Sequence, residues 1–331
     1  MQHKRGGIAA ALITLTAGAV LAPAMAWADT FQTIDNTADP TFNQLLGINN
    51  SGTIAGYFGS GALGHPNQGY TVTPPYAQAN FTAENFPSSV QTQVTGINNI
   101  GTTVGFWSNS AAGTSNFGFV DSGGRFTNVN DPLTPAGPPS VNQLLGVNDH
   151  NVAVGFYNGA TGNSHGYTYN IASGTFSASI NDPLGVSTTT AAINNAGQLA
   201  GFYVDANNVT HGFLDNGGVF TTYDAPGATA TMLLGLNNEG EAVGVETTPS
   251  GLSEGLILNI ASDTWSVVND PNGIGTTTLN GINDQGQIVG FYVDAAGNTD
   301  GLLMTVPEPA SLLLLVSGIT GLAAFRRTRR G

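Results

Sequence analysis

Two glutamates, Glu246 and Glu254, are the side chains of this sequence best suited to catalysis. Paired carboxyl groups cleave glycosidic bonds when they stand at a set separation, one as acid and the other as base or nucleophile. Both lie in the fifth of six repeated units, where they replace a tyrosine and a histidine of the fourth unit. A single active site must break the symmetry of a repeat, but drift in one unit explains the change more simply. We therefore treat them as weak catalytic candidates and expect no enzymatic activity.

Asp205 and Asp294 lie in equivalent loops that are rich in aspartate and asparagine. Calcium binds several oxygens of this kind, but the twelve-residue acidic loop that ends in glutamate is missing. We predict plain turns, with weak Ca²⁺ association as the alternative, and expect no defined metal site or cofactor. His165 and His211 occupy equivalent positions of different units and lack the spacing of a zinc motif, which predicts structural or surface histidines.

Pairs of asparagine, or asparagine and aspartate, are the most repeated polar feature of the chain. The six pairs are Asn49-Asn50, Asn98-Asn99, Asn148-Asp149, Asn194-Asn195, Asn237-Asn238 and Asn283-Asp284. One interpretation places them as a binding ring on one face of the molecule. The other has them cap hairpins through hydrogen bonds from the side chain to the backbone. Because all six units contain the pair, we favour the structural interpretation.

These pairs belong to a twelve-residue phrase that recurs six times at intervals of 43 to 50 residues. The copies begin at Gly47, Gly96, Gly146, Ala192, Gly235 and Gly281. In each copy an apolar strand ends at the first asparagine, and Asn-(Asn/Asp)-x-Gly then forms a turn whose fourth residue needs a positive φ. The third copy has Asn151 at that position, the residue that best tolerates the left-handed conformation after glycine. Two more strand-like segments follow each phrase, so each unit has the four strands of a propeller blade.

The ends of the repeat array predict a closed ring. The last unit stops after Gly301–Met304 without a fourth strand, while Phe31–Asp35 at the other end matches the fourth strand Phe220–Asp224. A first strand that completes the last blade leaves no sheet end exposed. We therefore predict an all-β, six-bladed β-propeller of four-stranded blades, closed by an N-terminal strand, over residues 29–305. An open β-solenoid is the alternative.

The charge of this domain disfavours nucleic acid as a partner. Residues 29–305 contain all of the 21 acidic residues except Glu308 and one of the seven basic residues, Arg125, which leaves 20 negative charges against 1 positive, a net charge of −19. Such a surface repels phosphate backbones. The chain has no cysteine, so disulfides do not stabilise it.

The first 28 residues have the three parts of a signal peptide. Lys4 and Arg5 are followed by an apolar stretch over residues 8–22 and by small residues that allow cleavage after Ala26 or, as we favour, after Ala28. An uncleaved anchor is the alternative, but the apolar stretch is short for a membrane span.

The tail, residues 306–331, has the features of a second targeting signal. Pro307, Glu308 and Pro309 precede an apolar segment over residues 310–325, for which we predict a hydrophobic helix of marginal length for a membrane span. A basic cluster follows: Arg326, Arg327, Arg329 and Arg330. The positive-inside rule keeps this cluster on the cytoplasmic side, so the tail acts as a membrane stop with the domain outside.

This order of parts at the C-terminus resembles the PEP-CTERM sorting signal of Gram-negative bacteria. The resemblance implies that a membrane-embedded exosortase recognises Pro307-Glu308-Pro309 and cuts nearby. The repeats in turn resemble the HAF family of extracellular repeats, through Gly281–Gly286 and His211–Phe213. The histidine of that second phrase varies along the chain, reading Gln68, Phe117, His165, His211, Glu254 and Asp300.

Together these features predict an exported protein with a binding or scaffold role at the cell surface or in a secreted, exopolysaccharide-containing matrix. The expected partners are the Sec export machinery and an exosortase in transit, with transient anchoring in the inner membrane, and then a neutral glycan or a matrix protein. The alternative is an extracellular hydrolase that acts on polysaccharide.

Overall fold

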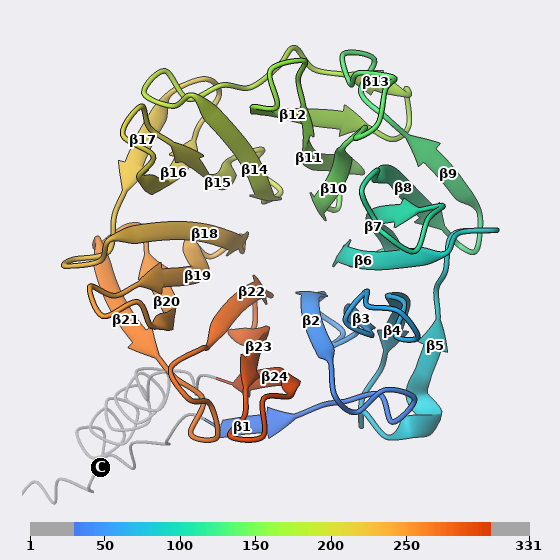
Figure 1. Cartoon of the computed structure of the whole chain (residues 1–331). Coiled ribbons are helices and arrows are strands. Elements are labelled where there is room, and N and C mark those ends of the chain that lie inside the picture. Colours follow the sequence, from blue (N-terminus) through green and yellow to red (C-terminus); the bar gives the residue numbers. More distant parts are fainter. Residues whose placement is uncertain (1–29, 306–331) are drawn as a thin grey trace, which may run out of the picture. The chain divides into compact units, whose positions relative to one another are not determined.

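Six four-stranded antiparallel sheets surround a central axis in the computed structural model, which describes residues 30–305 (Figure 1). We number the sheets as blades 1 to 6 along the chain, each from its innermost to its outermost strand. Blades 1 to 3 comprise β2 (Asn43–Ile48), β3 (Ile54–Phe58), β4 (Gln68–Val72) and β5 (Phe81–Ala83); β6 (Gln91–Ile97), β7 (Thr102–Ser108), β8 (Phe117–Ser122) and β9 (Phe126–Val129); and β10 (Asn142–Val147), β11 (Val152–Asn158), β12 (Ser164–Asn170) and β13 (Thr175–Phe176). Blades 4 to 6 comprise β14 (Ser187–Ile193), β15 (Leu199–Val204), β16 (Thr210–Asp215) and β17 (Phe220–Tyr223); β18 (Ala230–Leu236), β19 (Glu241–Thr247), β20 (Ser253–Asn259) and β21 (Thr264–Val268); and β22 (Thr278–Ile282), β23 (Gln287–Val293), β24 (Thr299–Thr305) and β1 (Thr30–Thr33). A single 3₁₀ turn, η1 (Gln78–Asn80), precedes β5.

The N-terminal strand closes the ring, as the ends of the repeat array predicted. β1 pairs antiparallel with β24, with Phe31 opposite Met304 and Thr33 opposite Leu302. The sheet order β1-β24-β23-β22 makes β1 the outermost strand of blade 6. This pairing confirms the closed propeller and rules out the open solenoid.

Glycine lets the six innermost strands approach one another at the axis. Each of these strands has a β-bulge just before the residue that begins the repeated phrase, as between Leu45 and Gly47. A Cβ atom on Gly47 would lie 2.9 Å from the Cα of Gly96, and one on Gly281 would lie 3.1 Å from the Cα of Gly47. Real Cβ atoms essentially never approach another atom as closely as 2.9 Å, and 3.1 Å is already tight, so there is little room at the axis for a side chain. This steric limit explains the glycine in five copies of the phrase, and the fourth copy accommodates only the methyl group of Ala192.

The core lies between blades as well as within them. In one cluster, Leu45, Tyr70 and Val72 of blade 1 are buried together with Val289 and Leu303 of blade 6. Within residues 30–305, no helix is long and apolar enough to cross a membrane. The predicted signal peptide and the predicted C-terminal hydrophobic helix lie outside the described residues.

Candidate functional site

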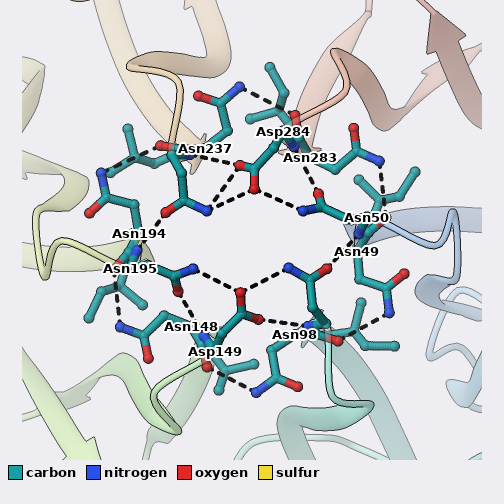
Figure 2. A pocket seen from close by; sticks show the side chains of 18 residues that line it. Asn49, Asn50, Asn98, Asn148, Asp149, Asn194, Asn195, Asn237, Asn283 and Asp284 are labelled. Atoms are coloured by element: carbon teal, nitrogen blue, oxygen red, sulfur yellow. Dashed lines mark hydrogen bonds between the residues drawn. The ribbon is translucent and has the colours of Figure 1, made fainter.

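The six asparagine pairs gather around the axis on one face of the propeller, at the turns between the first and second strands of each blade (Figure 2). We call this the asparagine face, and the other end of the sheets the opposite face. In blade 1, Oδ1 of Asn49 accepts hydrogen bonds from the backbone N–H of Ser51 at 3.1 Å and of Thr53 at 3.0 Å. Asn151 takes the place of the turn glycine with φ of 57°. The predicted hairpin caps are therefore present.

The first asparagine of each pair also joins its blade to the next. Its Nδ2 donates to the backbone carbonyl of the first asparagine in the following blade, as from Asn49 to Asn98 at 3.1 Å. The same bond recurs around the axis at Asn98, Asn148, Asn194, Asn237 and Asn283. The last of these bonds runs from Asn283 back to the carbonyl of Asn49 at 3.0 Å, so the circle closes between the two ends of the array.

The second residue of each pair forms a parallel circle. Its backbone N–H donates to the side-chain oxygen of the second residue in the next blade, and this bond recurs at Asn50, Asn99, Asp149, Asn195, Asn238 and Asp284. Asp149 and Asp284, from blades 3 and 6, each also accept side-chain amide bonds from both neighbours (Figure 2). Burial alone would raise the pKa of these aspartates, but the amide donors outweigh it and hold the pKa below its usual value.

These two circles of hydrogen bonds use the side-chain donors and acceptors that a binding ring would need to offer to a ligand. The space they enclose is a cavity of about 90 Å³, lined by the asparagine pairs and the apolar residue before each pair. The asparagine pairs therefore hold neighbouring blades together at the axis. Sequence reasoning predicted the caps and missed the bonds between blades; the signal lay in the recurrence of an amide at the first position of every pair and of an amide or a carboxylate at the second.

Glu246 and Glu254 are brought together by the structure. They lie directly opposite each other on β19 and β20, and Asn269 Nδ2 donates to Glu254 Oε1 at 2.9 Å. Glu246 is buried, and its pKa is raised by that burial, then by the negative charge of Glu254 and a hydrogen bond to it. Glycosidase pairs stand about 5 Å or more apart, so two carboxyl groups in hydrogen-bond contact fit a shared proton better than that reaction.

The remaining candidates serve their own loops or strands. Asp205 Oδ1 accepts from the backbone N–H of Asn207 and Val209 at 2.8 Å, and Asp294 Oδ1 makes the equivalent bonds in its loop. Such bonds from backbone N–H groups lower the pKa of both aspartates. Within residues 30–305 no three His, Cys, Asp or Glu side chains gather as a metal site would require.

The two histidines are part of their strands. Nδ1 of His165 lies 2.7 Å from Asn181 Oδ1, and Nδ1 of His211 lies 2.9 Å from Asp224 Oδ2. Each ring packs on the tyrosine opposite it in the neighbouring strand, with ring centroids 5.2 Å apart for His165 and 5.0 Å for His211. The predicted structural role describes them well.

On the opposite face, one turn recurs where the chain passes from the outermost strand of a blade to the innermost strand of the next. The backbone N–H of Asp131 donates to Asn142 Oδ1 at 2.9 Å, and the equivalent N–H groups are those of Asn36, Phe86, Asp182, Ala225 and Asp270, each bonded to a side chain of the next strand. Three of these turns display an apolar side chain to solvent: Leu133, Leu184 and Ile274 are 61%, 66% and 56% exposed.

Sequence reasoning also missed Glu84 and Asp121. They line a cavity of about 390 Å³ between blades 1 and 2 on the asparagine face, together with Thr103. The signal was available, because Glu84 stands where the other units have an apolar residue. Sequence comparison among units without a structure does not reveal, however, that the two carboxyl groups share one cavity.

Comparisons with known proteins bear on the tail and on the fold. The profile of the PEP-CTERM protein-sorting motif matches residues 305–330, as predicted from Pro307-Glu308-Pro309 and the arginine cluster. No curated protein matches the chain. The HAF-type repeats stay a prediction.

Solved structures share the fold at low sequence identity. Putative TolB from Agrobacterium tumefaciens aligns with a TM-score of 0.57 and 10% identity over 84% of this chain and 98% of that one. TolB from Acinetobacter baumannii aligns with a TM-score of 0.50 and 10% identity over 76% of this chain, which spans only 63% of that protein's length. A mutant of AofleA from Arthrobotrys oligospora also scores 0.50, at 9% identity, over 83% of this chain and 86% of that one. At such identities the likeness concerns the fold alone.

The fold and the tail thus define the class of this protein: a six-bladed β-propeller that carries a PEP-CTERM sorting motif. The motif indicates export, with a membrane-associated sorting step and an exosortase as the enzyme that targets the chain.

Proposed function

We propose that this exported propeller is a binding or scaffold protein of the cell surface or secreted matrix, which holds a neutral glycan or a matrix protein and catalyses no reaction. The observation that carries the proposal is the recurrent turn on the opposite face. It places Leu133 and Leu184 at equivalent points around the rim of the opposite face, two residues after Asp131 and Asp182, and Ile274 four residues after Asp270, each exposed by more than half. Exposed apolar side chains on several turns of one rim suit a repetitive partner, because several weak contacts then act together.

Two further features support this role. The hydrogen-bond circles at the axis hold the blades in fixed relation, so the rim turns are presented by a rigid frame. Rigid presentation lowers the entropy lost on binding. The sorting motif, in turn, supports passage through the inner membrane of a Gram-negative cell and final display at the surface or in an exopolysaccharide matrix or biofilm.

A polysaccharide hydrolase is the second candidate, and the Glu246–Glu254 pair is the observation that favours it. A protonated carboxyl group beside an ionised one can act in general acid catalysis. The hydrogen bond between the two groups fits a shared proton better than the wider separation of a glycosidase pair, which is why binding without turnover is the function we prefer.

Substitution of the three exposed apolar side chains on the rim of the opposite face tests whether they bind the partner. The exported protein would be tested on a glycan array and against the exopolysaccharide of its host strain, as wild type and with Leu133→Ser, Leu184→Ser and Ile274→Ser combined. We expect the triple variant to lose binding. The matched control is Val219→Ser with Val267→Ser, which removes side chains that are 68% and 53% exposed and lie away from the rim turns. Equal binding by the triple variant and wild type would contradict the proposal.

The sorting step has its own experiment. Replacing Pro307, Glu308 and Pro309 by alanine removes the motif that the exosortase is proposed to read. We expect the variant to accumulate in the inner membrane with its tail attached, as followed by fractionation and a C-terminal epitope. Processing and release at the wild-type rate would show that the motif is not used.

A further inference from the structure

Glu84 and Asp121 are two buried carboxyl groups that the proposed function does not use. Glu84 follows β5 of blade 1, Asp121 lies on β8 of blade 2, and they are 9% and 8% exposed. Both line the cavity of about 390 Å³ on the asparagine face, a volume typical of small-molecule sites. This cavity is separate from the rim turns of the opposite face.

The fold does not require acidic groups at these places. The carbonyl of residue 84 packs over a glycine of the third strand, and the residues in the same position of the other blades are Ile34, Val129, Ile180, Tyr223 and Val268. Thr103, which donates a hydrogen bond from its hydroxyl to Glu84 Oε1, is matched by Ile54, Ala153, Leu199, Ala242 and Ile288. The other five junctions between neighbouring blades thus fill with apolar side chains the space that the junction of blades 1 and 2 fills with polar ones.

Asp121 differs from its counterparts too. The residues at the same register position are Val72, Tyr169, Asp215, Leu258 and Met304. Asp215 is acidic as well, but its Oδ1 accepts a hydrogen bond from the backbone N–H of Gly218 at 2.6 Å. In Asp121, Oδ1 is buried and has no hydrogen-bond partner among the described residues. A buried acceptor without a partner is costly and calls for a donor from outside the chain.

Nor does the protein supply a counter-charge. Arg125 is the one Lys or Arg in residues 30–305, its side chain is exposed, and within that range no ion pair joins a Lys or Arg to these carboxyl groups. Burial, and next the negative charge of Asp121, raise the pKa of Glu84 to about 7 against the lowering effect of Thr103. Burial also raises the pKa of Asp121, against the lowering effect of the backbone N–H groups of Gly124 and Arg125. The raised pKa values mean that burial disfavours the ionised form of both carboxyl groups, and a cation bound beside them would favour that form again.

The rest of the cavity suits a polyhydroxylated ligand. Ser51, Thr53 and Thr71 line it with hydroxyl groups, and Asn49 and Asn99 are beside them. At its edge, glycines 101, 123 and 124 have no heavy atom within 4 Å of the place a Cβ would take, which leaves open space there.

We propose that this cavity binds an amino sugar with a free primary amine, whose ammonium group is held by Glu84 and Asp121 and whose hydroxyl groups contact Ser51, Thr53 and Thr71. An ammonium group donates three hydrogen bonds and carries the missing positive charge. A bare Ca²⁺ ion is the less suitable ligand, because it takes six to eight oxygens at short range and two carboxyl groups with one hydroxyl supply few of them. A ligand of sugar size also uses the volume of the cavity.

The test is calorimetric titration of the full exported protein with glucosamine oligomers, and with N-acetylglucosamine and glucose oligomers of equal length. We expect binding of the glucosamine series alone. Glu84→Gln and Asp121→Asn should each weaken it at least about tenfold, the effect of losing one charge-assisted hydrogen bond. Glu239→Gln, which removes the same charge from an exposed site on the same face, should leave it unchanged.

Other outcomes overturn the proposal. Equal binding of the acetylated or neutral oligomers would show that the carboxyl groups do not select an amine. A Ca²⁺-dependent rise in melting temperature that is lost in Glu84→Gln, without glucosamine binding, would identify a metal site. The rim substitutions do not alter this cavity. A negative result in the rim experiment therefore does not count against the amine site, and a negative titration with glucosamine does not count against binding at the rim. Circular dichroism of each variant confirms that the fold is retained.

Discussion

At the scale of single residues, the asparagine pairs do two jobs at once. The oxygen of the first asparagine caps its own hairpin, and its amide nitrogen bonds the next blade. Aspartate in the first position would keep the cap and lose the donor, and serine is too short to do both. The need for an acceptor and a donor on one side chain explains why asparagine stands in this first position in every unit.

Asn283 tests this double role, because it bonds across the junction between the last and first repeats. Asn283→Ala removes two acceptor contacts, from the backbone N–H groups of Gln285 and Gln287, and two donor bonds, to the carbonyl of Asn49 and to Gln287 Oε1. At about 1 kcal/mol or less for each net hydrogen bond, we expect the free energy of unfolding to fall by about 2–3 kcal/mol in urea titrations. Asn216→Ala, in an exposed turn, should stay within about 0.5 kcal/mol of wild type. Similar losses in both variants would contradict the ring.

Glu84 has the opposite effect on stability, and its sign depends on pH. Its pKa is about 7 in the folded protein against 4.5 as the ordinary value. Between these values the folded state holds a proton that the unfolded state has released, so the free energy of unfolding falls as pH rises through this window.

Glu84→Gln should remove this contribution to the fall in the free energy of unfolding with rising pH. The variant should match wild type near pH 5 and exceed its free energy of unfolding by about 2–3 kcal/mol near pH 8, as measured by urea unfolding at both values. Asp35, whose burial raises its pKa to about 6, titrates in both proteins and cancels in the comparison. A constant difference across this range would mean that Glu84 is ionised throughout.

At the scale of elements, one short strand decides whether the array is a ring. β1 has four residues and pairs with β24 alone, while the hydrogen bond from Ile34 N–H to the carbonyl of Gly301 extends the ladder. Blade 6 takes its outermost strand from the start of the described residues and its other three strands from their end. This pairing therefore joins the residues that are furthest apart in the sequence. Such contacts are entropically expensive to form.

Gln32→Pro tests the closure. Proline at this position removes a backbone donor from the ladder. Gln32 lies opposite Leu303, and the side chain of Gln32 is exposed. We expect a fall of about 3 kcal/mol in the free energy of unfolding and faster hydrogen exchange in β24. Gln32→Ala serves as control, with a small effect. Unchanged exchange in β24 would mean that β1 does not seal the blade.

Most of this element-level organisation is readable from the sequence, because it follows from local chemistry repeated six times. The Asn-x-x-Gly turns and the displaced fourth strand at Phe31 predict four-stranded blades and their closure. The contacts between blades are not readable in the same way. The bond from Asn49 to Asn98 and the cavity shared by Glu84 and Asp121 depend on how neighbouring sheets pack, which the local pattern does not encode. Symmetry alone makes Glu246 and Glu254 candidates, and only the strand register shows that they lie directly opposite each other.

At the scale of the whole molecule, the protein combines a rigid, strongly acidic ring with a C-terminal sorting motif. The net charge of −19 over residues 29–305 disfavours nucleic acid as a partner and favours solubility of the domain. The axis is closed by backbone and side-chain hydrogen bonds, so the surfaces that we propose for a partner are the rim of the opposite face and the cavity between blades 1 and 2. A molecule built in this way is suited to holding a partner in place.

Whether it only holds that partner is settled by one measurement. The exported protein is incubated with the exopolysaccharide that it binds best, and bound polymer and new reducing ends are measured in the same samples over time. We predict saturable binding with no release of reducing ends above the protein-free control. Sustained release that disappears in Glu246→Gln or Glu84→Gln would show that the propeller is an enzyme.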